Sequence, residues 1–156
     1  MDIRRTFDVL DYAMQNYPRT DALASKVDGQ WVTWSTDEYA RIANQISYGL
    51  LAMGLKKGDK IVSASNNRPE WNFLDMGMMQ IGVVHVPIYP TLGDDETAFI
   101  FEHSDARLAL VSDAALFQKF TKNRTPNIEK IFTFNDVQGA SNWKEIVELG
   151  EKNENT

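Results

Sequence analysis

The 156-residue chain contains no cysteine, which excludes a disulfide scaffold, a thiolate metal site and a cysteine nucleophile. Positive charge is also scarce, because 16 lysines and arginines stand against 22 aspartates and glutamates. Nucleic-acid binding needs a basic surface that displaces counterions from phosphates, so we expect no nucleic-acid partner. The same balance gives little support to an electrostatic anchor on anionic lipid.

Long hydrophobic runs are missing as well. The most apolar stretch, residues 76–89, is interrupted by Gln80, His85 and Pro87, and it is shorter than the ~20 residues of a membrane-spanning helix. The first eight residues carry early acids and lack the apolar segment of a signal peptide. We therefore expect no transmembrane segment and a cytoplasmic location, which the lack of cysteine also fits.

What the chain does have is enough apolar material for a core, since 43% of its residues are hydrophobic and 11% are aromatic. Apolar spacing predicts a helix over residues 6–16, and Asp28-Gly29 predicts a β-hairpin between extended runs at 22–27 and 30–34. Helices and short apolar strands then alternate, with strands expected at 60–64, 83–86, 107–111 and 130–134.

This alternation predicts the fold class. Strands that alternate with helices form a parallel sheet with helices on both faces, so we expect an α/β, Rossmann-like three-layer fold preceded by a helix and a hairpin. We see no internal linker. We therefore expect a single subdomain over residues 1–150 and a frayed polar tail over residues 151–156.

Two local signals predict where the long helix after the hairpin begins and ends. Ser35 and Glu38 have the spacing of a capping box. Gly54 is placed to end the helix in the left-handed conformation, with Leu55 as the apolar contact beyond it. We expect Gly82 to end the next helix, and we expect residues 83–86 to form a continuous buried strand followed by a turn bounded by Pro87 and Pro90.

Two glycine pairs have the separation of a phosphate-binding loop. They are Gly49 with Gly54 and Gly77 with Gly82, but Leu55 stands where the first pair needs a lysine. All four glycines lie within or at the end of predicted helices. We therefore interpret them as sites of close helix packing and helix termination rather than phosphate binding.

The two histidines, His85 and His103, do not form a metal-binding pattern such as HxxxH. Residues 102–105 contain the residue types of a catalytic triad, but sequence neighbours point in different directions and triads are assembled from separate elements. We assign both histidines a structural or merely solvated role, and we predict no metal-binding residue.

Acids and methionines offer two further candidates. Residues 94–96 are acidic, which suits the first turn of a helix better than a metal or acid–base cluster. Met76, Met78 and Met79 are candidates for the lining of an apolar ligand channel, but their spacing beside Trp71 is more typical of core packing.

Residues 66–71 are the most suggestive segment, because polar side chains gather just beyond the end of a strand. Open α/β sheets usually bind ligands at that end, and Arg68 is available there to meet an anion. The alternative is a capped turn with a surface ion pair, which we favour. The residues alone thus predict an α/β domain without a complete catalytic constellation.

A series of motifs carries a resemblance to a known family. It comprises Trp-Val-Thr-Trp-Ser at 31–35, the glycine-containing run at 49–61, Arg-Pro-Glu-Trp at 68–71, Gly-Val-Val-His-Val-Pro-Ile-Tyr-Pro-Thr at 82–91 and His-Ser-Asp-Ala-Arg at 103–107. In this order the motifs resemble the N-terminal region of AMP-forming acyl-CoA synthetases. The segments at 68–71 and 86–91 resemble the long-chain fatty acid branch most. The resemblance extends from the first helix to the Trp143 segment.

The resemblance implies an enzyme that joins a fatty acid to ATP as an acyl-adenylate and then passes the acyl group to coenzyme A. It implies ATP, Mg²⁺ and coenzyme A for the full-length ligase. The family's Thr/Ser/Gly-rich loop ending in Pro-Lys-Gly, its acidic ATP-site motif and its C-terminal lid with a catalytic lysine do not occur in residues 1–156. No catalytic, cofactor-binding or metal-binding role is therefore carried over to any residue here.

We accordingly expect an N-terminal fragment of a long-chain fatty acid–CoA ligase that is structural, binds no cofactor and is inactive alone. Its expected partner is the remainder of that ligase, and the expected cytoplasmic location is compatible with peripheral membrane contact of the full-length enzyme. A fragment should expose apolar surface, so we also expect self-association, with residues 76–89 or the helices beside them as the candidate surface. The alternatives are part of an acyl–carrier-protein ligase or shorter-chain synthetase, and a stand-alone non-catalytic interaction domain.

Overall fold

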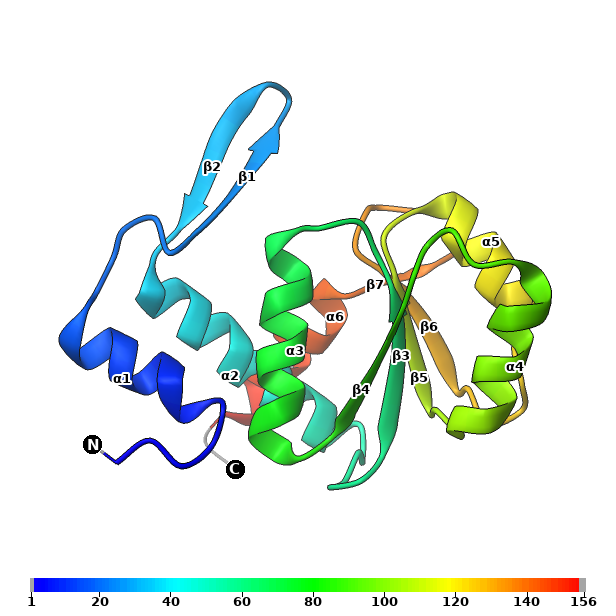
Figure 1. The fold of residues 1–156 in the computed structure, drawn as a ribbon, viewed down its shortest axis with the longest axis horizontal. Coiled ribbons are helices and arrows are strands. Elements are labelled where there is room, and N and C mark those ends of the chain that lie inside the picture. Colours follow the sequence, from blue (N-terminus) through cyan, green and yellow to red (C-terminus); the bar gives the residue numbers. More distant parts are fainter. Residues whose placement is uncertain (1, 155–156) are drawn as a thin grey trace.

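The short apolar strands predicted from residue 60 onward form one parallel sheet in the computed structural model, which describes residues 2–154 (Figure 1). Neighbouring strands in the sheet follow the order β4-β3-β5-β6-β7. The five strands, in that spatial order, are β4 (Val84–Ile88), β3 (Lys60–Ala64), β5 (Leu108–Val111), β6 (Lys130–Thr133) and β7 (Ser141–Asn142).

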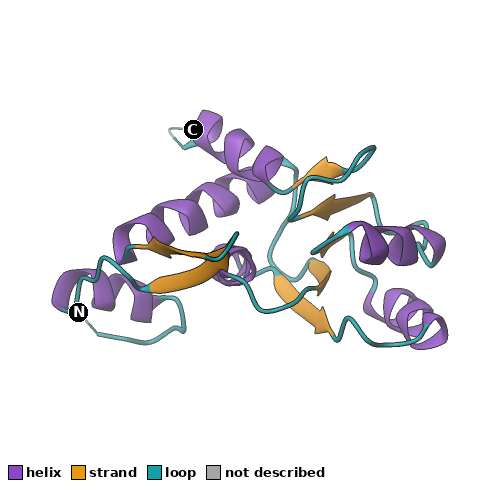
Figure 2. Ribbon diagram, turned by 90° about the horizontal axis from the view of Figure 1, so that it is seen from above, coloured by secondary structure: helices purple, strands orange, loops and turns teal. Residues whose placement is uncertain are grey.

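Helices cover both faces of the sheet, as the alternation predicts (Figure 2). One face carries α2 (Thr36–Ala52), α3 (Pro69–Ile81) and α6 (Lys144–Asn153), and the other carries α4 (Asp94–Ser104) and α5 (Ala114–Lys122). The N-terminal helix α1 (Asp8–Asn16) and the hairpin strands β1 (Leu23–Val27) and β2 (Gln30–Trp34) precede α2. The predicted α/β fold class is therefore confirmed.

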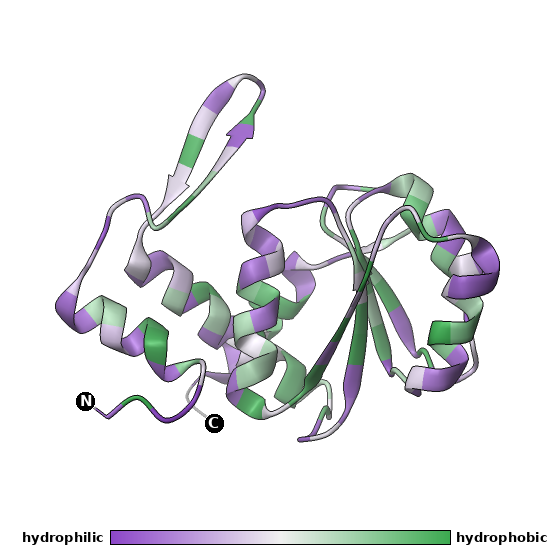
Figure 3. Cartoon of the chain, in the orientation of Figure 1, coloured by the Kyte–Doolittle hydropathy of each residue, from purple (hydrophilic) through white to green (hydrophobic). Residues whose placement is uncertain are grey.

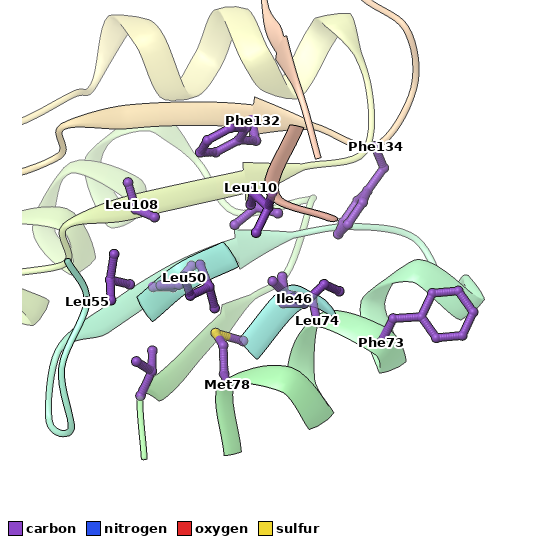
Figure 4. Close-up of a cluster of buried hydrophobic side chains, with 13 residues drawn as sticks. Ile46, Leu50, Leu55, Phe73, Leu74, Met78, Leu108, Leu110, Phe132 and Phe134 are labelled. Atoms are coloured by element: carbon purple, nitrogen blue, oxygen red, sulfur yellow. The ribbon is translucent and has the colours of Figure 1, made fainter. Parts of the chain in front are cut away.

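Two apolar clusters hold these layers together, because successive side chains of a strand point to opposite faces. On β3, Ile61 faces the α2, α3 and α6 side, whereas Val62 faces α4 and α5. Figure 4 shows the first cluster, in which side chains of the sheet meet those of α2 and α3. Its fully buried members include Ile46, Leu50, Leu74, Met78, Leu108 and Leu110.

The expectation of a continuous buried strand at residues 83–86 is wrong. β4 runs from Val84 to Ile88 and lies at the edge of the sheet, where Val84 is 47% exposed. Pro87 lies inside this strand rather than bounding a turn after it. The N–H of Val84 faces β3 through its bond to Asp59, so alternation turns the position of Pro87 outward, where its missing N–H breaks no bond of the sheet.

The C-terminal part contains one strand that the sequence pattern does not predict. β7 is only two residues long and pairs in parallel with β6. Two residues are too few to show any periodicity. The helix α6 that follows extends to Asn153 and so includes the first three residues of the predicted tail at 151–156; residues 155–156 lie outside the described part of the chain.

The predicted hairpin is confirmed, and it projects from the body of the molecule (Figure 1). Asp28 and Gly29 have φ angles of 49° and 80°, as the tight turn between twisted antiparallel strands requires. Hydrophobic positions occur on both of its strands (Figure 3). The most exposed large apolar side chain of the hairpin is that of Trp31, at 70%.

Both predicted ends of α2 are confirmed. The Ser35 hydroxyl accepts the N–H of Glu38, and the Glu38 carboxylate accepts the N–H of Ser35. At the other end Gly54 has a φ of 81°, and the N–H of Leu55 donates to the carbonyl of Leu50. These bonds satisfy groups that the helix itself leaves unpaired.

Glycines allow the helices of this layer to approach closely, as predicted for Gly49 and Gly77. A Cβ atom at Gly49 would collide with the carbonyl of Ile146 in α6, and one at Gly150 would collide with the carbonyl of Gln45 in α2. A Cβ at Gly77 would lie 2.8 Å from the carbonyl oxygen of Ala43. These contacts support the packing interpretation of the glycine pairs.

Candidate functional site

An open cleft of about 490 Å³ lies beyond the carboxyl ends of β3 and β4, the end of a parallel sheet where ligands usually bind. The polar segment 66–71 forms one of its walls, and the chain that leaves β4 forms the other. The residues that line it are Ser65, Asn66, Asn67, Arg68, Trp71, Asn72, Pro87, Ile88, Tyr89 and Pro90.

Arg68 is already paired within the protein, as the favoured alternative predicts. Its Nε and Nη2 donate to the two carboxylate oxygens of Glu70 at 2.9 and 2.7 Å, and its Nη1 donates to Asn135 at 2.8 Å. The guanidinium also lies 5.1 Å from the centroid of the Phe134 ring. Arg68 therefore has little capacity left to bind an anion.

Glu70 is held as a carboxylate in this arrangement. Burial alone would raise its pKa, but the hydrogen bonds from Arg68 and from its own backbone, together with the charges of Arg68 and Lys144, leave the pKa below its usual value. The ion pair is thus neutral overall. The remaining walls of the cleft consist of aromatic, aliphatic, amide and hydroxyl groups.

A hydrogen-bonded chain of three side chains lies beside the cleft, and sequence reasoning missed it. The imidazole of His85 on β4 is 2.7 Å from the Ser63 hydroxyl of β3 through Nε2. Its Nδ1 is 2.7 Å from a carboxylate oxygen of Asp75 on α3. The structural role predicted for His85 is thus to link β3 to α3 through two hydrogen bonds.

These three residue types are those of a catalytic triad, but the geometry does not suit nucleophilic catalysis. Ser63 has no exposed surface, so a substrate carbonyl cannot reach its hydroxyl. The alternation of side chains along β3 and β4 was the available signal, because it places Ser63 and His85 on the same face of neighbouring strands. The partner on α3 could not be identified from that pattern.

The other predicted candidates have structural roles. His103 stacks on Phe99, one turn earlier in α4, with ring centroids 5.5 Å apart. Residues 94–96 form the first turn of α4 as predicted. Asp94 there accepts hydrogen bonds from Lys122 and Asn123, and these bonds, that of Lys122 first, hold its pKa below the usual range.

The methionines divide between the core and a second, apolar hollow. Met78 is fully buried in the core, as predicted, whereas Met76 lines a groove of about 460 Å³ between α1, α2 and α3. Tyr39 also lines this groove and donates to the carbonyl of Asn72, which lines the cleft. Burial, and then the charge of Asp75, raises the pKa of Tyr39 to about 12.

Two searches over the described residues gave no further site. Between residues 2 and 154, no three or more histidine or acidic side chains gather closely enough to hold a metal ion. Within the same range, no helix is long and apolar enough to cross a membrane.

Comparison with known proteins relates the chain to a family. The sequence profile of the family described as AMP-binding enzyme matches residues 10–155. Among curated proteins, the long-chain-fatty-acid–CoA ligase FadD15 of Mycobacterium bovis is 31% identical over 96 residues, which is 56% of this chain and 16% of that protein. The 4-coumarate–CoA ligase-like 1 of Arabidopsis thaliana is 28% identical over 139 residues, covering 89% of this chain and 25% of that protein.

A solved structure shares the fold. The acyl-CoA synthetase of Brucella canis superposes with a TM-score of 0.77 at 16% identity, and the match covers 93% of this chain and 27% of that one. The described chain thus matches only part of each of these proteins, between 16% and 27% of their lengths.

Proposed function

Because the chain belongs to the family of AMP-binding enzymes, we propose that it forms the N-terminal part of a longer ligase that joins a long-chain fatty acid to coenzyme A. The observation that carries this proposal is the family match over residues 10–155. The name of the FadD15 relative supports the long-chain substrate. In this proposal the full-length enzyme uses ATP and Mg²⁺ to form an acyl-adenylate before it forms the thioester.

The role of this part of the enzyme is structural in our proposal, and the chain alone is inactive. Phosphoryl chemistry needs cationic and backbone donors around the phosphate groups. The described cleft does not provide such a donor set, because Arg68 is neutralised by Glu70. We therefore derive no catalytic step from these residues, and we assign them to the support of sites that other parts of the ligase complete.

A second candidate keeps the fold but changes the acid. The relative named 4-coumarate–CoA ligase-like 1 matches 89% of this chain, which favours a shorter or aromatic acid as the alternative substrate. Either ligase acts in the cytoplasm in our proposal. A fluorescent fusion that is confined to an organelle lumen would contradict this location.

The most direct genetic test is the coding sequence after codon 156. A reading frame that continues into a Thr/Ser/Gly-rich loop followed by Pro-Lys-Gly supports the ligase. A stop codon directly after Thr156 contradicts it and favours a stand-alone interaction domain.

We also propose that the isolated chain self-associates through the segment 76–89. Tyr89 is 77% exposed and Val84 lies uncovered on the edge strand, so contact between copies would remove apolar surface from water. Sedimentation should show concentration-dependent oligomers that Tyr89→Lys weakens. Trp31→Lys on the distant hairpin is the control, and a clean monomer at high concentration would contradict the proposal.

A further inference from the structure

The hydrogens of the Ser63–His85–Asp75 chain can be assigned from chemistry. An ionised carboxylate only accepts hydrogen bonds, so the 2.7 Å contact with Asp75 requires a proton on Nδ1 of His85. In a neutral imidazole Nε2 is then an acceptor, and the Ser63 hydroxyl donates to it over 2.7 Å. Both ring nitrogens are therefore engaged, and the plane of the imidazole is fixed.

The fixed imidazole supports a wall of the cleft. The ring of Trp71 lies 4.9 Å from the ring of His85, centroid to centroid, at an angle of 40°. Trp71 and Asp75 are four residues apart on α3 and so lie on one face of that helix. A single turn of α3 thus contacts His85 twice, through the indole ring and through the carboxylate.

A buried histidine is an unfavourable choice for a position that only has to fill space in the core. His85 is nearly buried, with 8% of its side chain exposed, and burying polar groups costs free energy unless every one of them is paired. An aliphatic or phenyl side chain would fill the same space without that requirement. What two fixed hydrogen bonds add is a defined orientation of the ring.

We propose that His85 is a positioning residue, which holds Trp71 in place as the ligand-facing wall of the cleft at the ends of β3 and β4. The ligand portion packed against this wall is uncharged, because Arg68 is already neutralised by Glu70. Asn66 and Asn67 also line the cleft beside it. The proposal concerns the order of Trp71 and does not depend on the reaction of the whole enzyme.

The first test is the tautomer of His85. The chain has two histidines, so a His103→Gln variant identifies the His85 signals in a ¹⁵N imidazole NMR spectrum at neutral pH. We expect the proton on Nδ1 and an unprotonated Nε2 that accepts a hydrogen bond. A proton on Nε2 instead would overturn the assignment of Ser63 as donor and with it the proposal.

The second test measures the exposure of Trp71 by acrylamide quenching, taken as the difference between each protein and its Trp71→Phe counterpart. In His85→Gln we expect the quenching constant of Trp71 to rise about twofold, because the ring loses its fixed support. His103→Gln is the matched control and should leave it unchanged. Equal quenching in wild type and His85→Gln, or an equal rise in the control, would overturn the proposal.

Two further variants keep the test valid if His85→Gln does not fold. Asp75→Asn still offers an oxygen acceptor to the Nδ1–H of His85, so the quenching constant of Trp71 should equal that of the wild type. Asp75→Ala removes the acceptor and should raise this constant. Ser63→Ala removes a single buried oxygen atom and should raise the quenching constant of Trp71 as well. If the quenching constant of Trp71 rose as much in Asp75→Asn as in Asp75→Ala, the hydrogen bond between Asp75 and His85 would not be what holds Trp71 in place. That result would contradict the proposal.

Discussion

Asp8 organises the start of α1 with one carboxylate. Its oxygens accept the backbone N–H groups of Arg4 and Arg5 and the guanidinium of Arg5. The side-chain bond from Arg5, followed by the backbone bond from Arg4, lowers the pKa of Asp8 to about 2. The residue before the helix, Phe7, supplies no side-chain cap, and Asp8 instead ties the two residues Arg4 and Arg5, which precede the helix, to its first turn.

This geometry predicts a pH-dependent contribution to stability. The folded pKa of Asp8 lies below its ordinary value of 3.8, so the contribution is complete above about pH 4 and is lost as the pH falls through about 2. Asp8→Asn should lower the urea midpoint at pH 7, and the difference from wild type should shrink toward pH 2. Asp37→Asn, in the first turn of α2, is the control. A difference independent of pH would contradict this account of Asp8.

Single residues also show the limits of prediction from sequence. An ion pair of Arg68 was predictable because its partner Glu70 is only two residues away, at the start of α3. The His85 chain was not, because its partners lie 22 and 10 residues away on two other elements. Contacts of this kind depend on the register of β3 against β4 and on the rotation of α3 over them.

At the scale of elements, local signals were the most reliable. The start of α2 at Ser35, the turn at Asp28-Gly29 and the helix end at Gly54 were all predicted correctly, because each depends on residues within one turn. The error at β4 has the opposite cause. An apolar run does not reveal whether its strand lies in the centre or at the edge of a sheet, which only the order of the strands decides.

The capping box gives a prediction for α2. Replacement of Ser35 by alanine removes the acceptor for the N–H of Glu38 and should cost about 1 kcal/mol of unfolding free energy. Chemical denaturation followed by far-ultraviolet circular dichroism measures this loss. Ser25→Ala in the hairpin is the matched change of the same residue type, and an equal loss in both variants would contradict a specific capping role.

The close contact of α2 with α6 gives a second prediction. Glycine to alanine normally favours a helix, but at Gly49 and Gly150 the added methyl group would meet a carbonyl of the partner helix. Each variant should therefore lose about 2 kcal/mol of unfolding free energy through overpacking. Glu148→Ala, at an exposed position of α6, should change little. A gain in stability at either glycine would show that the helices are not held this closely.

At the scale of the whole molecule, regular alternation was sufficient to predict a parallel sheet between two layers of helices. It was sufficient because crossover connections leave few arrangements for short apolar strands. The position of the cleft was also predictable, because open parallel sheets usually bind ligands at the carboxyl ends of their strands, here β3 and β4. What the pattern could not supply was the chemistry, since no complete catalytic constellation exists among the predicted candidates.

The central claim is that this chain is a structural part of an acyl-CoA ligase. ATP-dependent formation of palmitoyl-CoA, measured side by side for the 156-residue chain and for the product of a reading frame extended beyond Thr156, tests it most directly. We predict thioester formation only by the extended protein. Turnover by the 156-residue chain alone, or a folded extended protein without synthetase activity, would contradict the account.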